Sequence, residues 1–418
     1  MKITRTIIAA TAALAGASLA LTGCSAGGSD DGSSKITFSL YMTADSPAKA
    51  VYEELIDEFT ARTGIEVEMS YDTTNYENNI KVQMAANNLP DVFATHGWSV
   101  LRYSDFLAPL NDRSWVADVN PALDKSMRDS EGNIYALPLE YTVAGIDVNL
   151  DVLEAAGVDA DAITTWGDFD DALTKVKAAG VTPITASGKS SSAGNMADYI
   201  ASNAFSDSEK QKFTDGDFDV DAWSSAVLSH VAGWQKDGYF NPDYVSASLD
   251  DMASQLAQGQ AAFALVPASS ILGTALKINP DANIGFVPVP SDDGEQYTVG
   301  GEGINSFGVA KATKNKDAAL EFVDFLAEPA NAAKVAGSLG SYSGLTDVTA
   351  DLGVLQASYD KWVAPGTIPT MPFFDRVYLP GGIWNAMIAT TDSVITGQAT
   401  ADDAAEQLKV QFDTLYGQ

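Results

Sequence analysis

The fold class follows from residues 36–69, which read ITFSLYMTADSPAKAVYEELIDEFTARTGIEVEM. Their first six residues are rich in β-branched and aromatic side chains and predict a strand. Ser46 followed by Pro47 predicts a helix start, because serine caps a first turn and proline needs no backbone donor there. Gly64 then ends the helix, and the last five residues alternate as a second strand. A strand, a helix and a strand in succession predict parallel pairing with a covering helix.

The same alternation continues along the chain, which is predicted to be α/β throughout. A helix is expected at 80–86 and a short third strand at 91–94, so the opening region predicts a parallel sheet with covering helices. Further extended segments are expected at 134–141, 145–149, 261–266, 284–289 and 304–310. Further helices are expected at 150–156, 169–179, 195–234, 316–327 and from 384 onward. A chain of 418 residues exceeds one typical domain, and two α/β lobes are expected.

The N-terminus has the pattern of a secretory signal peptide. Lys2 and Arg5 precede residues 7–21, an almost uncharged run rich in Ala, Leu and Ile. This order matches a signal peptide, which is predicted to span 1–23. The apolar run has 15 residues, fewer than the roughly 20 that a helix needs to cross a bilayer. A permanent transmembrane anchor is therefore not expected.

The single cysteine stands directly after this apolar run. Leu21-Thr22-Gly23-Cys24 resembles the bacterial lipobox, which implies that Cys24 carries a thioether-linked diacylglycerol after cleavage. The alternative is a buried free cysteine in an ordinary first helix. Residues 24–34, CSAGGSDDGSS, are expected to form a flexible linker, because Gly, Ser and Asp bury little surface. With Cys24 lipidated, the mature body has no thiol for a disulfide, thiolate catalysis or metal ligation.

The composition narrows the range of ligands. The chain carries 24 basic and 56 acidic residues, a net charge of −32, which repels nucleic acid and favours neutral or cationic ligands. The acidic segment 215–221 resembles a calcium loop, but Val220 stands where a glycine is needed and the twelfth position is not Glu. A solvated turn is therefore expected there. No metal and no cofactor are predicted.

Six segments match, in order, the motifs of one large protein family. They lie at 53–65, 88–93, 131–138, 149–169, 259–263 and 319–327, and they include NLPDVF, GNIYALP and GQAAF. On these motifs the chain resembles the extracellular solute-binding lipoproteins of bacterial ABC importers, a family that mostly binds sugars and oligosaccharides. Each motif alone is weak, and their shared order over about 300 residues carries the resemblance.

The resemblance implies a periplasmic-binding-protein-like (Venus-flytrap) fold, in which two discontinuous α/β lobes are joined by crossover segments. The N-terminal lobe is expected at 35–143 and 305–343, and the C-terminal lobe at 144–304 and 344–418. Crossovers are expected near 142–148, 302–306 and 341–348, with hinge closure about them burying the ligand.

The resemblance also implies where the protein works and with what. It is expected to be a lipid-anchored monomer on the outer face of the cytoplasmic membrane. The Asp-rich, Lys-poor composition and the Ser/Gly linker, and not the resemblance, favour a Gram-positive host. Its partners are expected to be a sugar, in particular an oligosaccharide, and the permease subunits of an ABC importer. It is expected to catalyse no reaction.

Candidate site residues combine the two chemistries that a sugar needs. Its flat C–H faces pack on aromatic rings, and its hydroxyls bond to carboxylate, amide or imidazole groups. Such sites lie where strand ends meet the cleft of an α/β fold. First-lobe candidates lie at or just after the ends of predicted strands and are Tyr41, Asp45, His96, Trp98, Glu140 and Tyr141. Candidates farther along the chain are Ser269, Gly301, Glu302, Tyr342, Asp375 and Trp384, with Tyr342 assigned through the resemblance.

Alternative roles stay open at this stage. Asp45 is equally suited to capping the helix that follows it, and a lone histidine such as His96 is often structural. The net charge also fits a cationic ligand such as a polyamine. A secreted glycoside hydrolase is the alternative from another class, although no segment places two acids in a recognisable catalytic motif.

Overall fold

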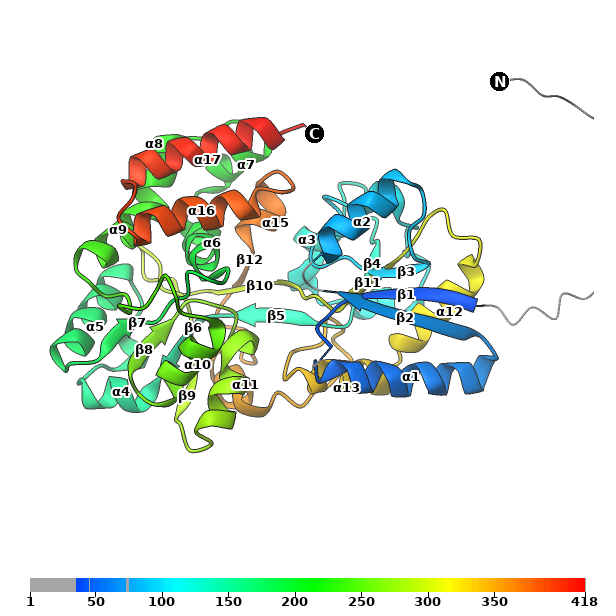
Figure 1. Cartoon of the computed structure of the whole chain (residues 1–418), viewed down its shortest axis with the longest axis horizontal. Helices are drawn as coiled ribbons and strands as arrows, with labels where there is room; N and C mark the ends of the chain where they lie inside the picture. Colours follow the sequence, from blue (N-terminus) through cyan, green and yellow to red (C-terminus); the bar gives the residue numbers. More distant parts are fainter. Residues whose placement is uncertain (1–34, 45, 73–74, 418) are drawn as a thin grey trace, which may run out of the picture. The chain divides into compact units, whose positions relative to one another are not determined.

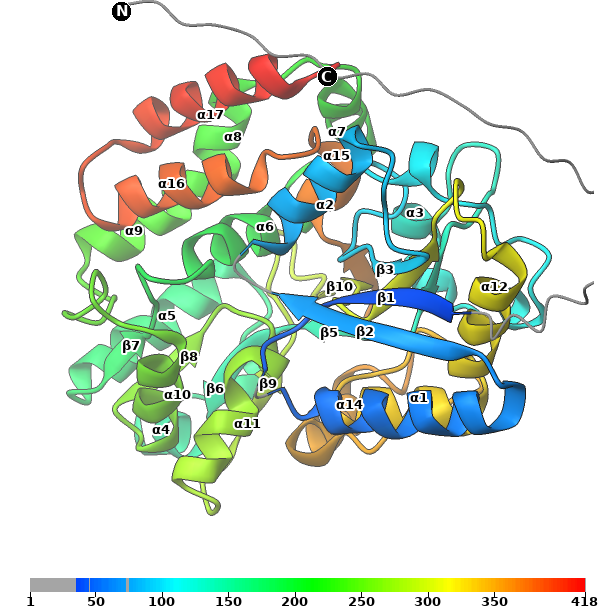
Figure 2. The ribbon, with the colours of Figure 1, turned by 45° about the vertical axis from the view of Figure 1, so that its right-hand side comes forward.

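The computed structural model describes residues 35–44, 46–72 and 75–417. They form an α/β body in which helices pack around three β-sheets (Figures 1 and 2). The structure does not describe the predicted signal peptide and linker, Asp45, or Cys24, the residue predicted to carry a lipid. Within the described part, no helix combines the length and the apolar character needed to span a bilayer.

The first sheet has the strand order β2-β1-β3-β11-β4. Its strands are β1 Lys35–Tyr41, β2 Glu66–Asp72, β3 Val92–Ala94, β4 Ala136–Pro138 and β11 Ser306–Val309. The predicted parallel pairing is confirmed for β1 with β2 and with β3. The rest of the sheet is antiparallel, because β11 returns from much later in the chain and pairs antiparallel with β3 and β4.

Helix α1 (Ala48–Thr63) follows β1 as predicted, but its start differs. Pro47 occupies the N-cap and no side chain caps the first turn, so the prediction that Ser46 is the cap is wrong. Ser46 lies one residue too early, and its backbone carbonyl instead accepts the Lys49 N–H. Gly64 ends the helix with φ +75°, a left-handed conformation that glycine adopts without a Cβ clash.

The body has two halves: the first half surrounds the first sheet, and the second half contains the other two sheets. A three-stranded sheet has the order β12-β10-β5, and a four-stranded sheet has the order β7-β8-β6-β9. Their strands are β5 Tyr141–Ala144, β6 Ile146–Asn149, β7 Thr182–Ile184, β8 Ala261–Ala264, β9 Ile284–Val287, β10 Thr298–Glu302 and β12 Thr370–Pro372. β5 and β10 pair antiparallel and run between the first sheet and the four-stranded sheet (Figure 1).

Helices cover these sheets, and the predicted helical region 195–234 contains the greater part of α6 and then α7 to α9. The helices after α1 are α2 Tyr76–Ala85, α3 Asp124–Met127, α4 Leu150–Ala155, α5 Trp166–Ala178, α6 Ser192–Ala204, α7 Asp207–Thr214, α8 Val220–Trp223, α9 Ser229–Lys236, α10 Leu249–Ala257, α11 Ala268–Ile278, α12 Lys316–Leu326, α13 Pro329–Ser338, α14 Gln356–Trp362, α15 Phe374–Tyr378, α16 Trp384–Ile395 and α17 Ala401–Leu415.

Two hydrophobic cores hold the body together. One surrounds the first sheet and includes Phe38, Phe59 and Phe307. The other surrounds the four-stranded sheet and includes Phe169 and Trp234. The chain passes from the first sheet to the three-stranded sheet between β4 and β5, and it passes back between β10 and β11. These two passages bring strand ends from both halves to the same place.

Candidate ligand-binding site

A cavity of about 670 Å³ lies among residues from both halves of the body. Its volume falls within the range of about 300–1,000 Å³ that is usual for small-molecule sites. Its lining combines aromatic rings with carboxyl, amide and hydroxyl groups. The lining residues are Tyr41, Thr43, His96, Trp98, Glu140, Thr142, Ser191, Asn195, Asp198, Leu249, Pro267, Gly303, Ile304, Leu339, Ser341, Phe373, Asp375, Arg376 and Trp384.

One wall of the cavity is aromatic and is built from Tyr41, His96 and Trp98, which we call the first wall. Tyr41 ends β1, and the other two residues follow β3. The Tyr41 and His96 rings stack with centroids 4.3 Å apart, and the Trp98 ring meets His96 edge-on at 4.8 Å. The parallel pairing of β1 with β3 brings these rings together, because both strands end at the same edge of the sheet.

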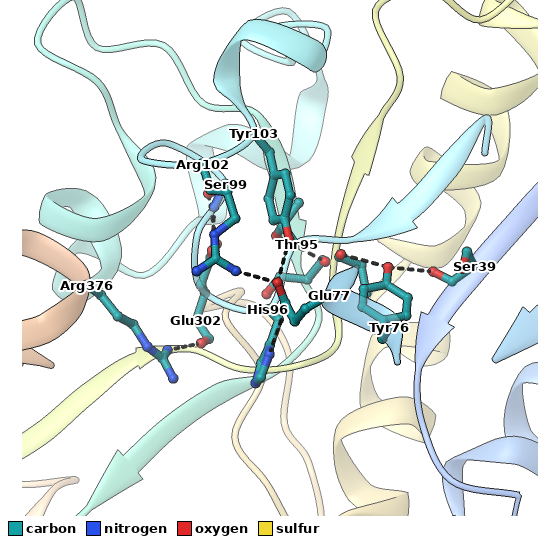
Figure 3. A network of polar contacts seen from close by, with 12 residues as sticks. Ser39, Tyr76, Glu77, Thr95, His96, Ser99, Arg102, Tyr103, Glu302 and Arg376 are labelled. Carbon is teal, nitrogen blue, oxygen red and sulfur yellow. Dashed lines mark hydrogen bonds and ion pairs between the residues drawn. The ribbon is translucent and has the colours of Figure 1, made fainter. Parts of the chain in front are cut away.

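The loop that carries His96 and Trp98 has a left-handed backbone. His96 has φ +48° and Gly97 has φ +81°. The turn is closed by the Trp98 N–H, which donates to the Thr95 carbonyl at 3.1 Å. Ser99 donates from its N–H and its hydroxyl to the Glu302 carboxyl, both at 3.2 Å (Figure 3). Glu302 therefore holds the loop from beneath and does not line the cavity.

A second aromatic wall faces the cavity from the other half of the body. Phe373 is the N-cap of α15, and Trp384 begins α16. The Arg376 guanidinium lies 4.4 Å from the centroid of the Phe373 ring and donates to the Glu302 carbonyl oxygen (Figure 3). Arg376 thus connects the second wall to the strand that also supports the first wall.

Two buried carboxyl groups lie beside the second wall. Asp198 on α6 accepts the Asp375 N–H at 2.9 Å through Oδ1. Its Oδ2 is buried and has no hydrogen-bond partner among the described residues. Burial raises the pKa of Asp198 well above its usual value, and repulsion from Asp375 adds to the increase. Burial also raises the pKa of Asp375 to about 6, although Arg376 opposes the increase. A carboxyl that keeps its proton both donates to and accepts from a ligand hydroxyl.

Glu140 lies at the point where three chain segments meet. Its Oε2 accepts the Asn305 side-chain amide at 2.8 Å, and its Oε1 accepts the Ser341 hydroxyl at 3.1 Å. The Glu140 backbone carbonyl accepts the Gly303 N–H at 2.9 Å. The Tyr52 hydroxyl on α1 donates to the other side of Asn305 at 2.6 Å. One carboxylate therefore ties the segment before β5 to the segments around 303–305 and 341.

The structure places the predicted site residues in several groups. Those that line the cavity are Tyr41, His96, Trp98, Glu140, Asp375 and Trp384. Gly301 and Glu302 lie on β10 behind the lining, and a Cβ on Gly301 would lie 3.0 Å from the Phe373 ring. Asp45 and the side chain of Ser269, at the start of α11, lie outside what the structure describes.

Tyr141 and Tyr342 line a different cavity, of about 380 Å³. Their ring centroids are 6.3 Å apart, and the Tyr342 ring lies 4.7 Å from Tyr359 on α14. The Tyr141 N–H donates to the Tyr342 carbonyl at 2.7 Å. Because side chains alternate along an extended strand, Glu140 and its neighbour Tyr141 point in different directions. The two tyrosines therefore pack beside the crossover and away from the first cavity.

Several lining residues were not predicted from the sequence. Asn195 and Asp198 stand within α6, where no local pattern separates a ligand-facing side chain from a packed one. Ser341 and Thr142 reach the cavity only through pairing of distant segments. Arg376 offered a signal, since it is a basic residue directly after a predicted acidic one. Across the described residues, no group of three or more His, Cys, Asp and Glu is arranged to hold a metal ion.

Comparison with known proteins gives consistent matches over nearly the whole chain. A family model for bacterial extracellular solute-binding proteins matches residues 43–333. The melibiose/raffinose/stachyose-binding protein MelE of Bacillus subtilis is 29% identical to this chain over an alignment 418 residues long. The alignment covers 95% of this chain and 94% of MelE.

Two solved structures share the fold. A Bacillus subtilis binding protein in an open conformation superposes with a TM-score of 0.83 at 27% identity, covering 91% of this chain and 97% of that one. A Bacillus licheniformis sugar transporter protein in complex with stachyose superposes with a TM-score of 0.78 at 28% identity, covering 91% and 100%.

Proposed function

Because the chain belongs to the bacterial extracellular solute-binding proteins, we propose that it captures an oligosaccharide between its two aromatic walls and delivers it to the permease of an ABC importer. The α/β fold of these proteins supports capture in a cleft, with release on opening. MelE and the stachyose-bound structure, which match almost end to end, support a ligand built from several sugar units.

The observation that carries the proposal is that the two aromatic walls and several carboxyl and amide groups line one cavity. Trp98 on one wall and Trp384 on the other offer flat faces to the C–H surfaces of sugar rings. Asp198, Asp375 and Asn195 lie beside the second wall and suit ring hydroxyls. A cavity of this composition fits a ligand that is apolar on its faces and polar at its edges.

The charges in the cavity favour a neutral ligand. The lining holds three carboxyl groups and one arginine, so an anion such as a sugar phosphate meets more acids than cations. A polyamine needs ionised carboxylates, but burial raises the pKa of Asp198 well above its usual value, which disfavours the charged form of that carboxyl. Glu140 already bonds to Asn305 and Ser341.

The site residues that we propose for ligand contact are those lining the cavity on its two walls and at Glu140. We propose that the two lobes expected from the sequence move about the crossovers as the ligand binds. Their bounds are 35–143 with 305–343 for the first lobe and 144–304 with 344–418 for the second. We further propose that Cys24 carries the lipid that holds the protein at the cell surface, and that the body acts as a monomer without catalysing a reaction.

Calorimetric titration of residues 35–418 tests the proposal. Raffinose and stachyose serve as neutral probes, glucose 6-phosphate as an anionic probe and spermidine as a cationic probe. We expect saturable 1:1 binding of a neutral oligosaccharide that chromatography afterwards recovers intact. If only spermidine or only glucose 6-phosphate binds, the ligand is a cation or an anion and not a neutral oligosaccharide. Hydrolysed sugar would overturn the binding-protein function.

Loss of the lipid anchor is tested separately in cells. A Cys24→Ala variant is expected to leave the membrane fraction, whereas the wild-type protein stays with the membranes and incorporates a labelled fatty acid. Retention of the Cys24→Ala variant in the membranes would contradict the anchor.

A further inference from the structure

The left-handed loop of the first wall is held from two sides. His96 is not glycine, and its φ of +48° is a conformation that persists only where the surroundings fix it. Glu302 fixes one end of the loop through Ser99. On the other side, α2 contributes the carboxylate of Glu77 (Figure 3).

Glu77 contacts three residues of this region at once. Its Oε1 lies 3.5 Å from His96 Nδ1, and its Oε2 forms an ion pair with Arg102 and accepts the Tyr103 hydroxyl at 3.1 Å (Figure 3). The Glu77 side chain is 28% exposed and that of Arg102 is 14% exposed, so the pair is largely shielded from water. Shielding strengthens the attraction relative to a surface ion pair.

Arg102 extends the effect of Glu77 to the tryptophan. Its guanidinium lies 4.1 Å from the centroid of the Trp98 ring, a cation–π distance. The backbone N–H of Arg102 also donates to the backbone carbonyl of Trp98 at 3.0 Å. Tyr41 stacks on His96 and completes the wall. Neither Glu77 nor Arg102 lines the cavity, so both act on the rings without reaching a ligand.

We propose that Glu77 and Arg102 are a positioning pair that fixes the orientation of His96 and Trp98, so that the first wall is already shaped for ring stacking before the ligand arrives. The inference rests on the proposed function in one respect, that the ligand stacks on this wall. A wall fixed in advance loses less conformational freedom on binding, which raises affinity without adding a contact.

The first test is the affinity of Glu77→Gln, which keeps the shape of the side chain and removes its charge. Its Kd for stachyose or raffinose, measured by calorimetry, is expected to rise about tenfold. Arg102→Gln should give a similar rise, and the double variant should bind no more weakly than the weaker single variant, because the two residues act as a unit.

Glu328→Gln is the matched control for the loss of one carboxylate. Glu328 pairs with Arg62 through two contacts of 2.9 Å, and neither residue lines the cavity. Its Kd should equal that of the wild type. If Glu77→Gln folds poorly, Tyr103→Phe removes only one hydrogen bond to the same carboxylate and should raise Kd by about twofold to threefold.

The second test needs no ligand. The chain has two histidines, so ¹⁵N-histidine labelling gives two pairs of imidazole nitrogen signals, and His230→Gln assigns each pair to its residue. Burial lowers the pKa of His96, the Glu77 carboxylate opposes this, and Arg376 and Arg102 lower the pKa further. In Glu77→Gln the His96 signal should therefore titrate at a lower pH than in the wild type, while the His230 signal should not move.

The two tests separate the failure of this inference from the failure of the proposed function. If the wild type binds a sugar and Glu77→Gln binds it equally well, the positioning role is overturned. If the wild type binds neither sugar, the proposed ligand is wrong, and the histidine titration alone then tests the positioning role of Glu77. An unchanged His96 titration in Glu77→Gln then overturns the positioning role.

Discussion

Trp98 and Trp384 are the two large flat surfaces of the cavity, one on each wall. They come from opposite ends of the chain and meet only because the fold places the end of β3 opposite the start of α16. Aromatic anchors of this kind carry a large share of the binding energy in many interfaces. Each tryptophan is therefore expected to matter more than any single polar contact.

Trp98→Ala and Trp384→Ala should each raise the Kd for the bound oligosaccharide roughly 30-fold, which corresponds to about 2 kcal/mol of binding free energy. Trp362→Ala is the control, because Trp362 is half-buried and does not line the cavity. Calorimetric titration of the three variants measures the effect. Equal affinity of Trp98→Ala and Trp362→Ala would contradict stacking on the first wall.

Glu302 is expected to make stability depend on pH. Burial raises its pKa from 4.5 to about 7 in the folded protein. Between these values the folded protein keeps a proton that the unfolded chain has lost, so the contribution of Glu302 to stability is complete below about pH 4.5 and is lost as the pH rises through 7. The size of the effect is about 3 kcal/mol.

Urea unfolding of the wild type and of Glu302→Gln at pH 4.5 and pH 8 isolates this term, because both proteins share every other buried acid. The free energy of unfolding of the wild type, relative to the variant, should fall by about 3 kcal/mol across this range. A difference that stays constant with pH would show that Glu302 ionises at its ordinary pKa.

At the scale of elements, Glu140 connects the segments that join the two halves. Its carboxylate accepts from Asn305 and Ser341, and Asn305 in turn accepts from Tyr52 on α1. Hydrogen bonds to a charged group contribute more than neutral ones, and their donors are costly to leave unpaired in the interior. The three segments are therefore expected to move as one unit when the halves open or close.

Glu140→Ala should lower the free energy of unfolding by about 3 kcal/mol, because two buried donors lose their acceptor. Glu140→Gln keeps one carbonyl acceptor and should cost about 1 kcal/mol. Denaturant unfolding at neutral pH measures both. If the two variants are equally stable, the carboxylate does not hold the crossover segments together.

Elements with local causes could be predicted from the sequence, and those with distant causes could not. β1, α1 and β3 follow from the patterns of their own residues. The antiparallel pairing of β11 depends on a strand from elsewhere in the chain. For the same reason Tyr41, His96 and Trp98 could be proposed at strand ends, whereas Asp198 inside α6 could not.

At the scale of the whole molecule, the net charge of −32 acts over long distances. It attracts cations and repels anions at low ionic strength, but it exerts no net force on a neutral sugar. Salt screens this field, since the Debye length falls from about 30 Å at 0.01 M to about 8 Å at 0.15 M. The dependence of affinity on salt therefore reports the charge of the ligand.

Between about 0.01 M and 0.3 M NaCl, the Kd for a neutral oligosaccharide should change by less than about twofold. Fluorescence titration of the same protein preparation at both salt concentrations measures this. A loss of affinity of about tenfold or more with added salt would instead indicate a cationic ligand, in line with the surface charge.

Hydrogen exchange with and without stachyose tests most directly whether one sugar bridges both walls. Bound ligand should slow exchange of backbone amides in the loop 95–99 and, in the same sample, in 373–376 and at the start of α16. Amides in β2, on the outer edge of the first sheet, should exchange unchanged. Protection of both segments is the predicted result. Protection of neither segment, or of only one, would contradict capture between the two walls.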